Sequence, residues 1–234
     1  MANGAPVSSA SRTKSFIYAN VLTLSASGLA LLWLSRDGRL DFAIAQRFFD
    51  ATRGGFFLRD HTWLSAVGHD AFKWFALGVW LLMLTLALAS FAVRRLKPAC
   101  ADLWWFCMTA LAAALWVSWL KGQNAHACPW DIDVFGGAKP WYPLLGAAPI
   151  DEAGRCWPGG HAAGGFSLIA GYFAWRHSQP ALARMWLVFS LLLGSLMSAA
   201  QIMRGAHFLS HNLWTLWWCV LISLMFYAAR HWRY

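Results

Sequence analysis

The stretch Met185-Trp-Leu-Val-Phe-Ser-Leu-Leu-Leu-Gly-Ser-Leu-Met-Ser-Ala-Ala-Gln-Ile-Met203 contains no charged side chain, and the polar stretch Arg204-Gly-Ala-His-Phe-Leu-Ser-His211 follows it directly. A helix needs about 20 mostly apolar residues to cross the hydrocarbon core of a bilayer. The first stretch therefore predicts a transmembrane helix. The second predicts a polar segment at the membrane surface where that helix ends.

The same length rule, applied to the whole chain of 234 residues, predicts six membrane spans. No internal repeat is visible, and no polar segment is long enough to fold as a separate soluble domain. The sequence thus predicts an all-α, polytopic membrane protein in which residues 1–234 form a single six-helix bundle. The spans are expected near Phe16–Leu34, Ala71–Val93, Leu103–Leu120, His161–Trp175, Met185–Met203 and Leu213–Ala229.

The composition supports a membrane protein and argues against a nucleic-acid binder. Hydrophobic residues make up 59% of the chain and charged residues 12%, compared with roughly 25% charged residues in soluble domains. The formal net charge is +9, but the basic residues are scattered among apolar spans and form no nucleic-acid-binding motif. Contact with anionic lipid headgroups accounts for this charge. We therefore expect the bilayer as a partner, no nucleic acid and no obligate protein partner.

The segment Ser35–Asp70 between the first two spans is too polar to cross a membrane. Apolar residues from Leu40 to Phe49 recur at helical spacing, which predicts a helix lying along the membrane surface. Asp60–Asp70 predicts a second surface helix with Asp60 as its N-cap. We expect both helices to form a collar beside the site, with His61 and His69 at the interface rather than in catalysis.

The distribution of lysine and arginine predicts the orientation in the membrane. With six spans, both termini lie on one side, whose basic residues are concentrated in short loops and tails. The positive-inside rule for short loops places that side in the cytoplasm. The loop Lys121–Gly160 and the segment Arg204–His211 then lie on the outer face. The compact six-span form and short tails favour the inner membrane of a bacterium.

Only two of the five cysteines, Cys128 and Cys156, are expected on the outer face. An oxidising compartment permits a disulfide between them, which stabilises a fold by roughly 3 kcal/mol when it closes a loop of this size. Two free thiols remain the alternative.

Arg204, His207 and His211 are spaced i, i+3 and i+7, which a helix places on one face. Ionisable side chains beside a membrane span are costly unless they are paired or face a wet cavity, so they indicate a functional site. The alternative is that they only end the span at the interface.

Two further polar segments are expected near this one, at the ends of other spans. They contribute Lys121, Arg155 and His161, and the amides of Gly159 and Gly160 open the fourth span. Fixed positive charge beside imidazoles suits an anionic substrate that needs a nucleophile and a proton donor. Phosphoryl transfer meets this description, because its catalysis consists mainly of positioning and electrostatic stabilisation.

These segments, within residues 121–211, follow a three-part pattern. Lys121 is followed after six residues by Cys128-Pro129. Pro158-Gly159-Gly160-His161 comes next, and Ala200-Gln201 is followed after five residues by His207 and after three more by His211. The pattern resembles the type 2 phosphatidic acid phosphatase (PAP2) superfamily over roughly residues 100 to 225. The matching positions are Lys121, Pro129, Pro158, Gly160, His161 and His207. The family has arginine where this chain has Cys128 and Gln201, serine at Gly159 and aspartate at His211.

The resemblance implies a membrane-embedded phosphatase that forms a phosphohistidine intermediate without a metal or other cofactor. His207 would be the nucleophile and His161 the general acid. Lys121 would bind the phosphate, and Arg204 and Arg155 are the expected replacements for the missing arginines.

In the family, the aspartate that this chain lacks orients the nucleophilic histidine, and more than one residue is available to replace it. His211 would take over that role in a weaker form, or Asp131 or Asp133 would reach the site. The expected substrate is a phosphate monoester or pyrophosphate on a lipid headgroup, with the individual lipid left open. A soluble phosphate ester from the outer compartment is the alternative.

Two other functions remain open from the sequence. His207 and His211 are spaced i, i+4, as metal-binding histidines are on a helix, and His161 would complete a three-histidine metal site. A non-catalytic anion binder or transporter is the second alternative.

Overall fold

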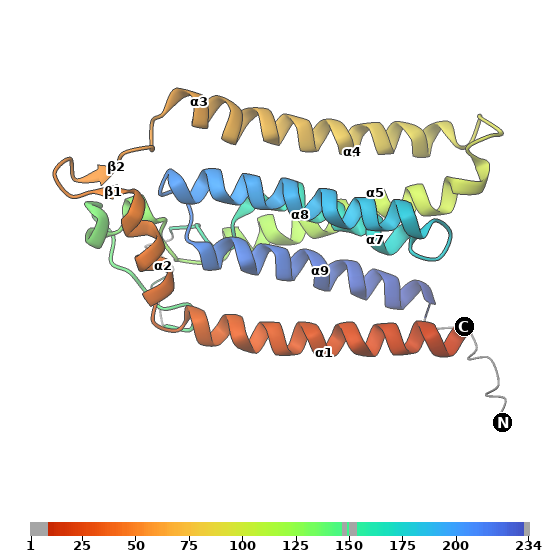
Figure 1. Cartoon of the computed structure of the whole chain (residues 1–234), viewed down its shortest axis with the longest axis horizontal. Coiled ribbons are helices and arrows are strands. Elements are labelled where there is room, and N and C mark those ends of the chain that lie inside the picture. Colours follow the sequence, from red (N-terminus) through yellow and green to blue (C-terminus); the bar gives the residue numbers. More distant parts are fainter. Residues whose placement is uncertain (1–8, 147–148, 150–153, 232–234) are drawn as a thin grey trace.

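The structure is a computed structural model that describes residues 9–146, 149 and 154–231. Its helices run side by side along one axis, and a very short two-stranded sheet lies at one end (Figure 1). The helices are α1 (Ser9–Ser35), α2 (Arg39–Ala45), α3 (Thr62–Ser65), α4 (Phe72–Ala89), α5 (Cys100–Gly122), α6 (Gly160–Phe166), α7 (Ala170–Trp175), α8 (Pro180–Met203) and α9 (Leu209–His231), and the strands are β1 (Phe49–Asp50) and β2 (Gly55–Phe56).

The prediction of an all-α polytopic membrane protein is confirmed. Among the described residues, five helical segments are long and apolar enough to cross a membrane. They correspond to five of the six predicted spans, and they are Ala10–Ser35, Thr62–Ala89, Lys97–Gly122, Pro180–Met203 and Leu209–His231.

The sixth predicted span, His161–Trp175, corresponds to α6 and α7, which a 3₁₀ turn at Ser167–Ile169 joins. These pieces have seven, three and six residues, so together they are about 24 Å long, shorter than the roughly 30 Å hydrocarbon core. The count of six spans therefore stays a prediction.

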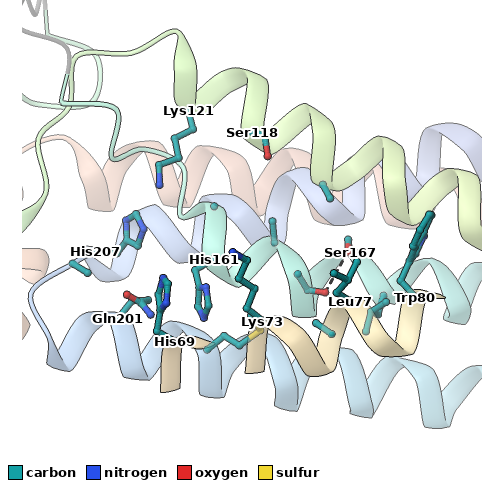
Figure 2. A pocket seen from close by; sticks show the side chains of 18 of the residues that line it. His69, Lys73, Leu77, Trp80, Ser118, Lys121, His161, Ser167, Gln201 and His207 are labelled. Atoms are coloured by element: carbon teal, nitrogen blue, oxygen red, sulfur yellow. Dashed lines mark hydrogen bonds between the residues drawn. The ribbon is translucent and has the colours of Figure 1, made fainter. Parts of the chain in front are cut away.

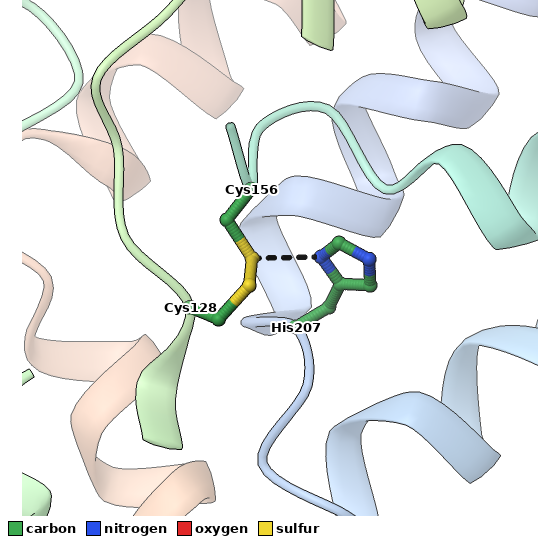
Figure 3. A group of neighbouring side chains, drawn as sticks. All are labelled: Cys128, Cys156 and His207. Atoms are coloured by element: carbon green, nitrogen blue, oxygen red, sulfur yellow. Dashed lines mark hydrogen bonds between the residues drawn. A yellow bond between two sulfur atoms is a disulfide. The ribbon is translucent and has the colours of Figure 1, made fainter. Parts of the chain in front are cut away.

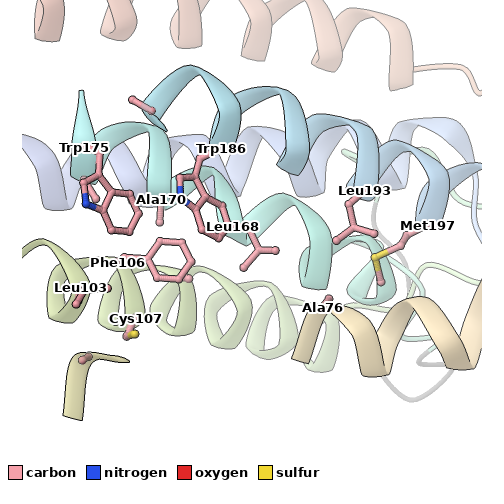
Figure 4. Close-up of a cluster of buried hydrophobic side chains, with 14 residues drawn as sticks. Ala76, Leu103, Phe106, Cys107, Leu168, Ala170, Trp175, Trp186, Leu193 and Met197 are labelled. Carbon is pink, nitrogen blue, oxygen red and sulfur yellow. The ribbon is translucent and has the colours of Figure 1, made fainter. Parts of the chain in front are cut away.

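Glycines let α6 and α7 pack closely against α8 in the interior of the bundle. A Cβ atom on Gly165 would lie 2.5 Å from the backbone nitrogen of Gly194, and one on Gly171 would lie 2.4 Å from Cγ of Trp186. Only glycine permits such close approach of a neighbouring backbone or ring. Large side chains from α5, α7 and α8, among them Phe106 and Trp186, fill the core beside these contacts (Figure 4).

The segment before α4 differs from its prediction. Residues 60–70 do not form a separate surface helix, because α3 continues through a π-helical turn, Ala66–Ala71, into α4 as one membrane helix. The predicted cap Asp60 is also wrong: the ring of His61 accepts a hydrogen bond from the amide of Leu64 at 3.4 Å. Gly68 lies in this turn without ending the helix, and no proline occurs between Thr62 and Ala89, so the helix runs on.

The first half of the same loop is partly as predicted. Helix α2 forms where the apolar residues recur, but the chain then turns into the β1–β2 hairpin instead of remaining helical to Phe49. Aromatic rings attach this region to the loop after α5 and to the turn between α8 and α9: Phe56 packs against Phe135 with ring centroids 5.4 Å apart, and Phe42 packs edge-on against Phe208 at 5.7 Å. The loop therefore covers the end of the bundle opposite the start of α1 and the end of α9 (Figure 1).

Candidate active site

A cavity of about 600 Å³ lies at the loop-bearing end of the bundle, between α4, α5, α6 and α8. Its polar lining comes from chain segments far apart in the sequence, and Figure 2 shows the basic side chains gathered at one end. The three predicted motifs thus come together around one space. The polar and glycine residues at this end are His69, Lys73, Lys121, Gly160, His161, Gln201 and His207.

His207 is placed by a tight turn after α8, which ends at Met203. Gly205 has a φ of +74°, a left-handed conformation that ends helices and favours glycine. The carbonyl of Gln201 then accepts bonds from the amides of Ala206 and His207, at 2.9 and 3.4 Å. This turn corrects the prediction that Arg204, His207 and His211 share one helical face, since α8 and α9 are separate helices.

The imidazole of His207 is buried and has a disulfide as its neighbour. Cys128 and Cys156 are joined, with Cα atoms 5.2 Å apart, so the predicted pair is present in the structure. Nδ1 of His207 lies 3.3 Å from Sγ of Cys156, and the second ring nitrogen points away from the sulfur (Figure 3). Burial, followed by the positive charge of Lys121 and the neighbouring His161, lowers the pKa of His207 to about 3. His207 is therefore neutral near pH 7 and retains a lone pair for attack.

His161 faces the same cavity from the first turn of α6. Its Nε2 lies 3.3 Å from the carbonyl oxygen of Gly68, and because a carbonyl can only accept, Nε2 carries the proton. Gly68 lies in the π-helical turn before α4, and such turns leave carbonyls without their ordinary helical partners. The local distortion thus supplies the hydrogen-bond acceptor that orients His161.

His69 and Lys73 also line the cavity, although His69 was predicted to lie at the interface only. The His69 ring stacks on His161 with centroids 4.6 Å apart and planes 8° apart, and its Nδ1 lies 2.8 Å from Oδ1 of Asp70. The place of His69 in the cavity has a signal in the sequence, because positions 69, 73, 76, 77 and 80 recur at helical spacing and so share one helix face. In the structure all five line the cavity. The signal was missed because the predicted span began after His69.

Replacing Gly68 with alanine is expected to destabilise the protein and slow any reaction that uses His161. The new methyl carbon would lie 2.8 Å from Cβ of Ala200 on α8, which cannot rotate away. Overpacking of this kind costs about 1–3 kcal/mol. The expected result is a lower melting temperature in detergent together with a lower kcat.

Gly78→Ala on the same membrane helix is the matched control, because the methyl group that this substitution adds would have no neighbour within 4 Å among the described residues. We expect it to leave both quantities unchanged. Equal effects of the two substitutions would contradict the packing of Gly68 against α8.

Lys121 and Gly160 lie side by side at the polar end of the cavity. A Cβ on Gly160 would lie 3.2 Å from Cδ and 3.6 Å from Nζ of Lys121. In Figure 2 the Lys121 side chain extends from α5 toward His207 and His161. Gly159, in contrast, does not line the cavity, and its amide donates to the carbonyl of His211 at 3.0 Å. The structure therefore supports an anion-binding position for Gly160 but gives no support for Gly159.

The two arginines expected to replace those of the family do not line the cavity. Nε of Arg204 donates to the carbonyl of Arg59 at 3.1 Å. Arg155 is exposed on the loop and has a positive φ of 48°. Asp131 and Asp133, the alternatives for the missing aspartate, do not line the cavity either.

His211 lies behind His207, outside the main cavity. Its side chain is 6% exposed and lines a separate, much smaller cavity of about 20 Å³ with Asp41 and His126. The rings of His207 and His211 are 5.9 Å apart between centroids, and Nδ1 of His211 has no hydrogen-bond partner among the described residues. His211 is therefore close to the nucleophile position, but the structure shows the Cys156 sulfur, not His211, beside Nδ1 of His207.

Gln201 stands at a position where the family has arginine, and the sequence had suggested no function for it. Its side chain is 3% exposed and lines the cavity, and its amide nitrogen Nε2 has no hydrogen-bond partner among the described residues. A buried donor without a partner costs about 1–3 kcal/mol. An unpartnered N–H group facing a basic cavity is suited to bind an anion there.

The variant Gln201→Met is expected to change stability and anion affinity in opposite directions. Removal of an unpaired buried donor should raise the melting temperature of the empty protein, whereas inhibition by inorganic phosphate should weaken about tenfold. Thermal unfolding and phosphate inhibition measure the two quantities. Gln123→Met, at an exposed position after α5, should alter neither. Unchanged phosphate inhibition in Gln201→Met would contradict a role for this amide.

A three-histidine metal site is not supported by the geometry. In the part of the chain that the structure describes, one group of three metal-ligating side chains brings its donor atoms within 4.8 Å of one another. It consists of Cys128, Cys156 and His207, and its two sulfurs are already joined to each other. His161 and His211 do not belong to it.

Comparison with known proteins identifies a family. A family model described as the PAP2 superfamily matches residues 102–234, which include all the cavity-lining residues from α5 to the turn after α8. No curated protein and no solved structure matches the chain.

Proposed function

The chain belongs to the PAP2 superfamily and is a membrane protein of phosphatase type, and on this basis we propose that it hydrolyses a lipid phosphate through a phosphohistidine intermediate. The observation that carries the proposal is the single cavity into which Lys121, His161 and His207 project from three separate segments. A phosphate at its polar end would have a cation, an amide donor and two imidazoles around it. These are the groups that phosphoryl transfer requires.

The apolar part of the cavity supports a lipid as the substrate. Beyond the basic end, side chains from the membrane helices α4, α5 and α8 and from the segment that begins with α6 continue the lining, and Figure 2 shows Leu77 and Trp80 on this side. A lipid phosphate matches both parts, since its headgroup carries the anion and its chains are apolar. The apolar lining includes Ala76, Leu77, Trp80, Ala110, Leu111, Ala114, Ala163, Leu168 and Met197.

The geometry supports the following order of bond changes. The lone pair on Nε2 of His207 forms a nitrogen–phosphorus bond while the bond from phosphorus to the ester oxygen breaks. His161 in its protonated form gives a proton to the departing oxygen, and the Lys121 ammonium stabilises the charge on the other phosphate oxygens. A water molecule, deprotonated by the now neutral His161, then displaces His207 and releases inorganic phosphate.

We propose that this reaction needs no metal ion. Lys73 and Lys121 both line the cavity and would repel a divalent cation, and they provide positive charge of the kind that a metal supplies in other phosphatases. Phosphate release in excess chelator tests this directly. Loss of activity in chelator that added metal restores would favour the metal-dependent alternative.

The orientation follows as a further part of the proposal. The start of α1 and the end of α9 lie at one end of the bundle, opposite the end with the β1–β2 hairpin (Figure 1). The cavity is lined by residues at that hairpin end, among them Lys121, Cys128 and His207. The positive-inside rule places the start of α1 and the end of α9 on the cytoplasmic side of a bacterial inner membrane. The cavity would then open on the periplasmic side. A disulfide at the cavity agrees with an oxidising compartment. A reporter fused to the C-terminus that is active only outside the cytoplasm would overturn this orientation.

The central experiment measures inorganic phosphate released by the purified protein in vesicles containing phosphatidic acid or a polyprenyl pyrophosphate. A water-soluble phosphate ester serves as the comparison. Turnover of the lipids above that of the soluble ester supports the proposal, whereas preferential turnover of the soluble ester would remove the lipid assignment. Binding of phosphate without any turnover would support the non-catalytic alternative.

A further inference from the structure

The contact between His207 and the disulfide determines which ring nitrogen carries the proton. Nδ1 of His207 lies 3.3 Å from Sγ of Cys156, and Cys156 is fully buried. A disulfide sulfur has no hydrogen, so it can only accept a hydrogen bond. The bond therefore requires a proton on Nδ1. In a neutral imidazole this leaves Nε2 without a proton, on the side of the ring that points away from the sulfur (Figure 3).

We propose that the Cys128–Cys156 disulfide is a positioning element of the active site, in which Sγ of Cys156 accepts the Nδ1 proton of His207 and so keeps Nε2 free for attack. This inference rests on the proposed phosphatase function. It assigns the disulfide a part in the reaction beyond fastening a loop. Cys156 acts through His207 and does not contact the substrate phosphorus.

Among side chains of the described residues, Sγ of Cys156 is the hydrogen-bond partner of the His207 ring, and the backbone of the same Cys156 is a second acceptor close to the ring. His211 is 5.9 Å away between ring centroids, and no hydrogen bond joins the two rings. The ring of His207 is 5% exposed, so bulk water does not supply a partner in its place. An imidazole without a fixed partner on Nδ1 would divide between two tautomers, one of which has its Nε2 lone pair blocked by a proton.

The proposal makes the reaction sensitive to reduction. Two electrons and two protons from a thiol reductant convert the disulfide into two thiols, and the Cys156 thiol then has a proton of its own to donate. A thiol that donates to Nδ1 favours the tautomer with the proton on Nε2, which cannot attack phosphorus. Reduction should therefore lower kcat while the lysine and amide that bind phosphate remain in place.

The test compares two variants that both lack the disulfide. Cys128→Ala/Cys156→Ala removes the acceptor, whereas Cys128→Ala/Cys156→Asp replaces it with a carboxylate that accepts the Nδ1 proton more strongly. Both lose the same crosslink, so a difference between them cannot come from loop fastening. We expect kcat to fall about tenfold or more in the alanine variant, with little change in phosphate inhibition, and to recover at least in part in the aspartate variant.

The pH profile gives a second readout. A carboxylate beside the ring raises the pKa of an imidazole, so the acidic limb of kcat/KM should move to higher pH in the aspartate variant than in the native protein. A further experiment needs no mutation: the native protein is reduced with a phosphine in the presence of chelator, and its free thiols are counted to show that the disulfide is broken. Chelator is needed because Cys128, Cys156 and His207 have donor atoms within 4.8 Å of one another and would bind zinc after reduction.

The outcomes separate the two proposals. Oxidised native protein that releases no phosphate from any lipid phosphate would overturn the proposed function itself. Active native protein, with equal kcat in the alanine and aspartate variants and after reduction, would overturn only the role of the disulfide. Recovery by aspartate together with the shifted acidic limb would establish Cys156 as a positioning residue.

Discussion

The variant His207→Ala should lose phosphate release by roughly 10⁴-fold or more, the largest effect expected of any single substitution in this protein. His207 is the buried imidazole whose Nδ1 is held by the Cys156 sulfur and whose other nitrogen is free to face the cavity. Without it, no described side chain is placed to form the covalent intermediate. Release of phosphate from a radiolabelled lipid phosphate measures the loss, and acid-labile label on the native protein would reveal the intermediate.

The control for this prediction is His231→Ala, which removes an imidazole at the far end of α9. It should retain native turnover, and both variants should keep a melting temperature close to that of the native protein. Native rates in His207→Ala would remove the assignment of the nucleophile. Loss of activity in both variants to the same extent would show a general effect on the fold instead.

His161→Ala should lower kcat by roughly 10²- to 10⁴-fold on a lipid phosphate, because its alkoxide is a poor leaving group that needs a proton. An ester with an acidic leaving group, such as p-nitrophenol, needs no such help. Its turnover should fall about tenfold at most. The ratio of the two losses separates proton donation from a structural effect of the substitution, which would slow both esters equally.

The proposed acid role of His161 also relies on the hydrogen bond from its Nε2 to the carbonyl of Gly68, because that bond orients the ring. The stacked ring of His69 makes the matched control, since it lines the same cavity without that bond. His69→Ala should retain the same preference between the two esters as the native protein. A loss in His69→Ala that is much larger on the lipid phosphate than on the p-nitrophenyl ester, with no such difference in His161→Ala, would transfer the acid role to His69.

Much of the fold was predictable because it depends on local properties of the chain. Hydropathy summed over about 20 residues predicts where a membrane helix runs, and five of the six predicted spans are helices of sufficient length and apolarity. The joining of α3 to α4 was not predicted, since the polar residues His69 and Asp70 suggested a boundary where the helix continues through a π-helical turn.

The site was predictable where chemistry and spacing within one motif were sufficient. Lys121, Gly160, His161 and His207 were selected from the sequence, and all of them line the cavity. Arg204 was selected because it lies three residues before His207. The left-handed turn at Gly205 ends the helical spacing on which that selection rested, and Arg204 instead binds a carbonyl outside the cavity.

Composition and spacing along the chain were enough to specify the membrane helices, the order of the three motifs and the pair of cysteines available for a disulfide. The neighbours of the central imidazole depend instead on the folded bundle. The Cys156 sulfur beside Nδ1, the His69 ring on His161 and the unpaired amide of Gln201 all arise between segments far apart in sequence. Such relations follow from how the helices pack, and no local pattern encodes the distance between two helices.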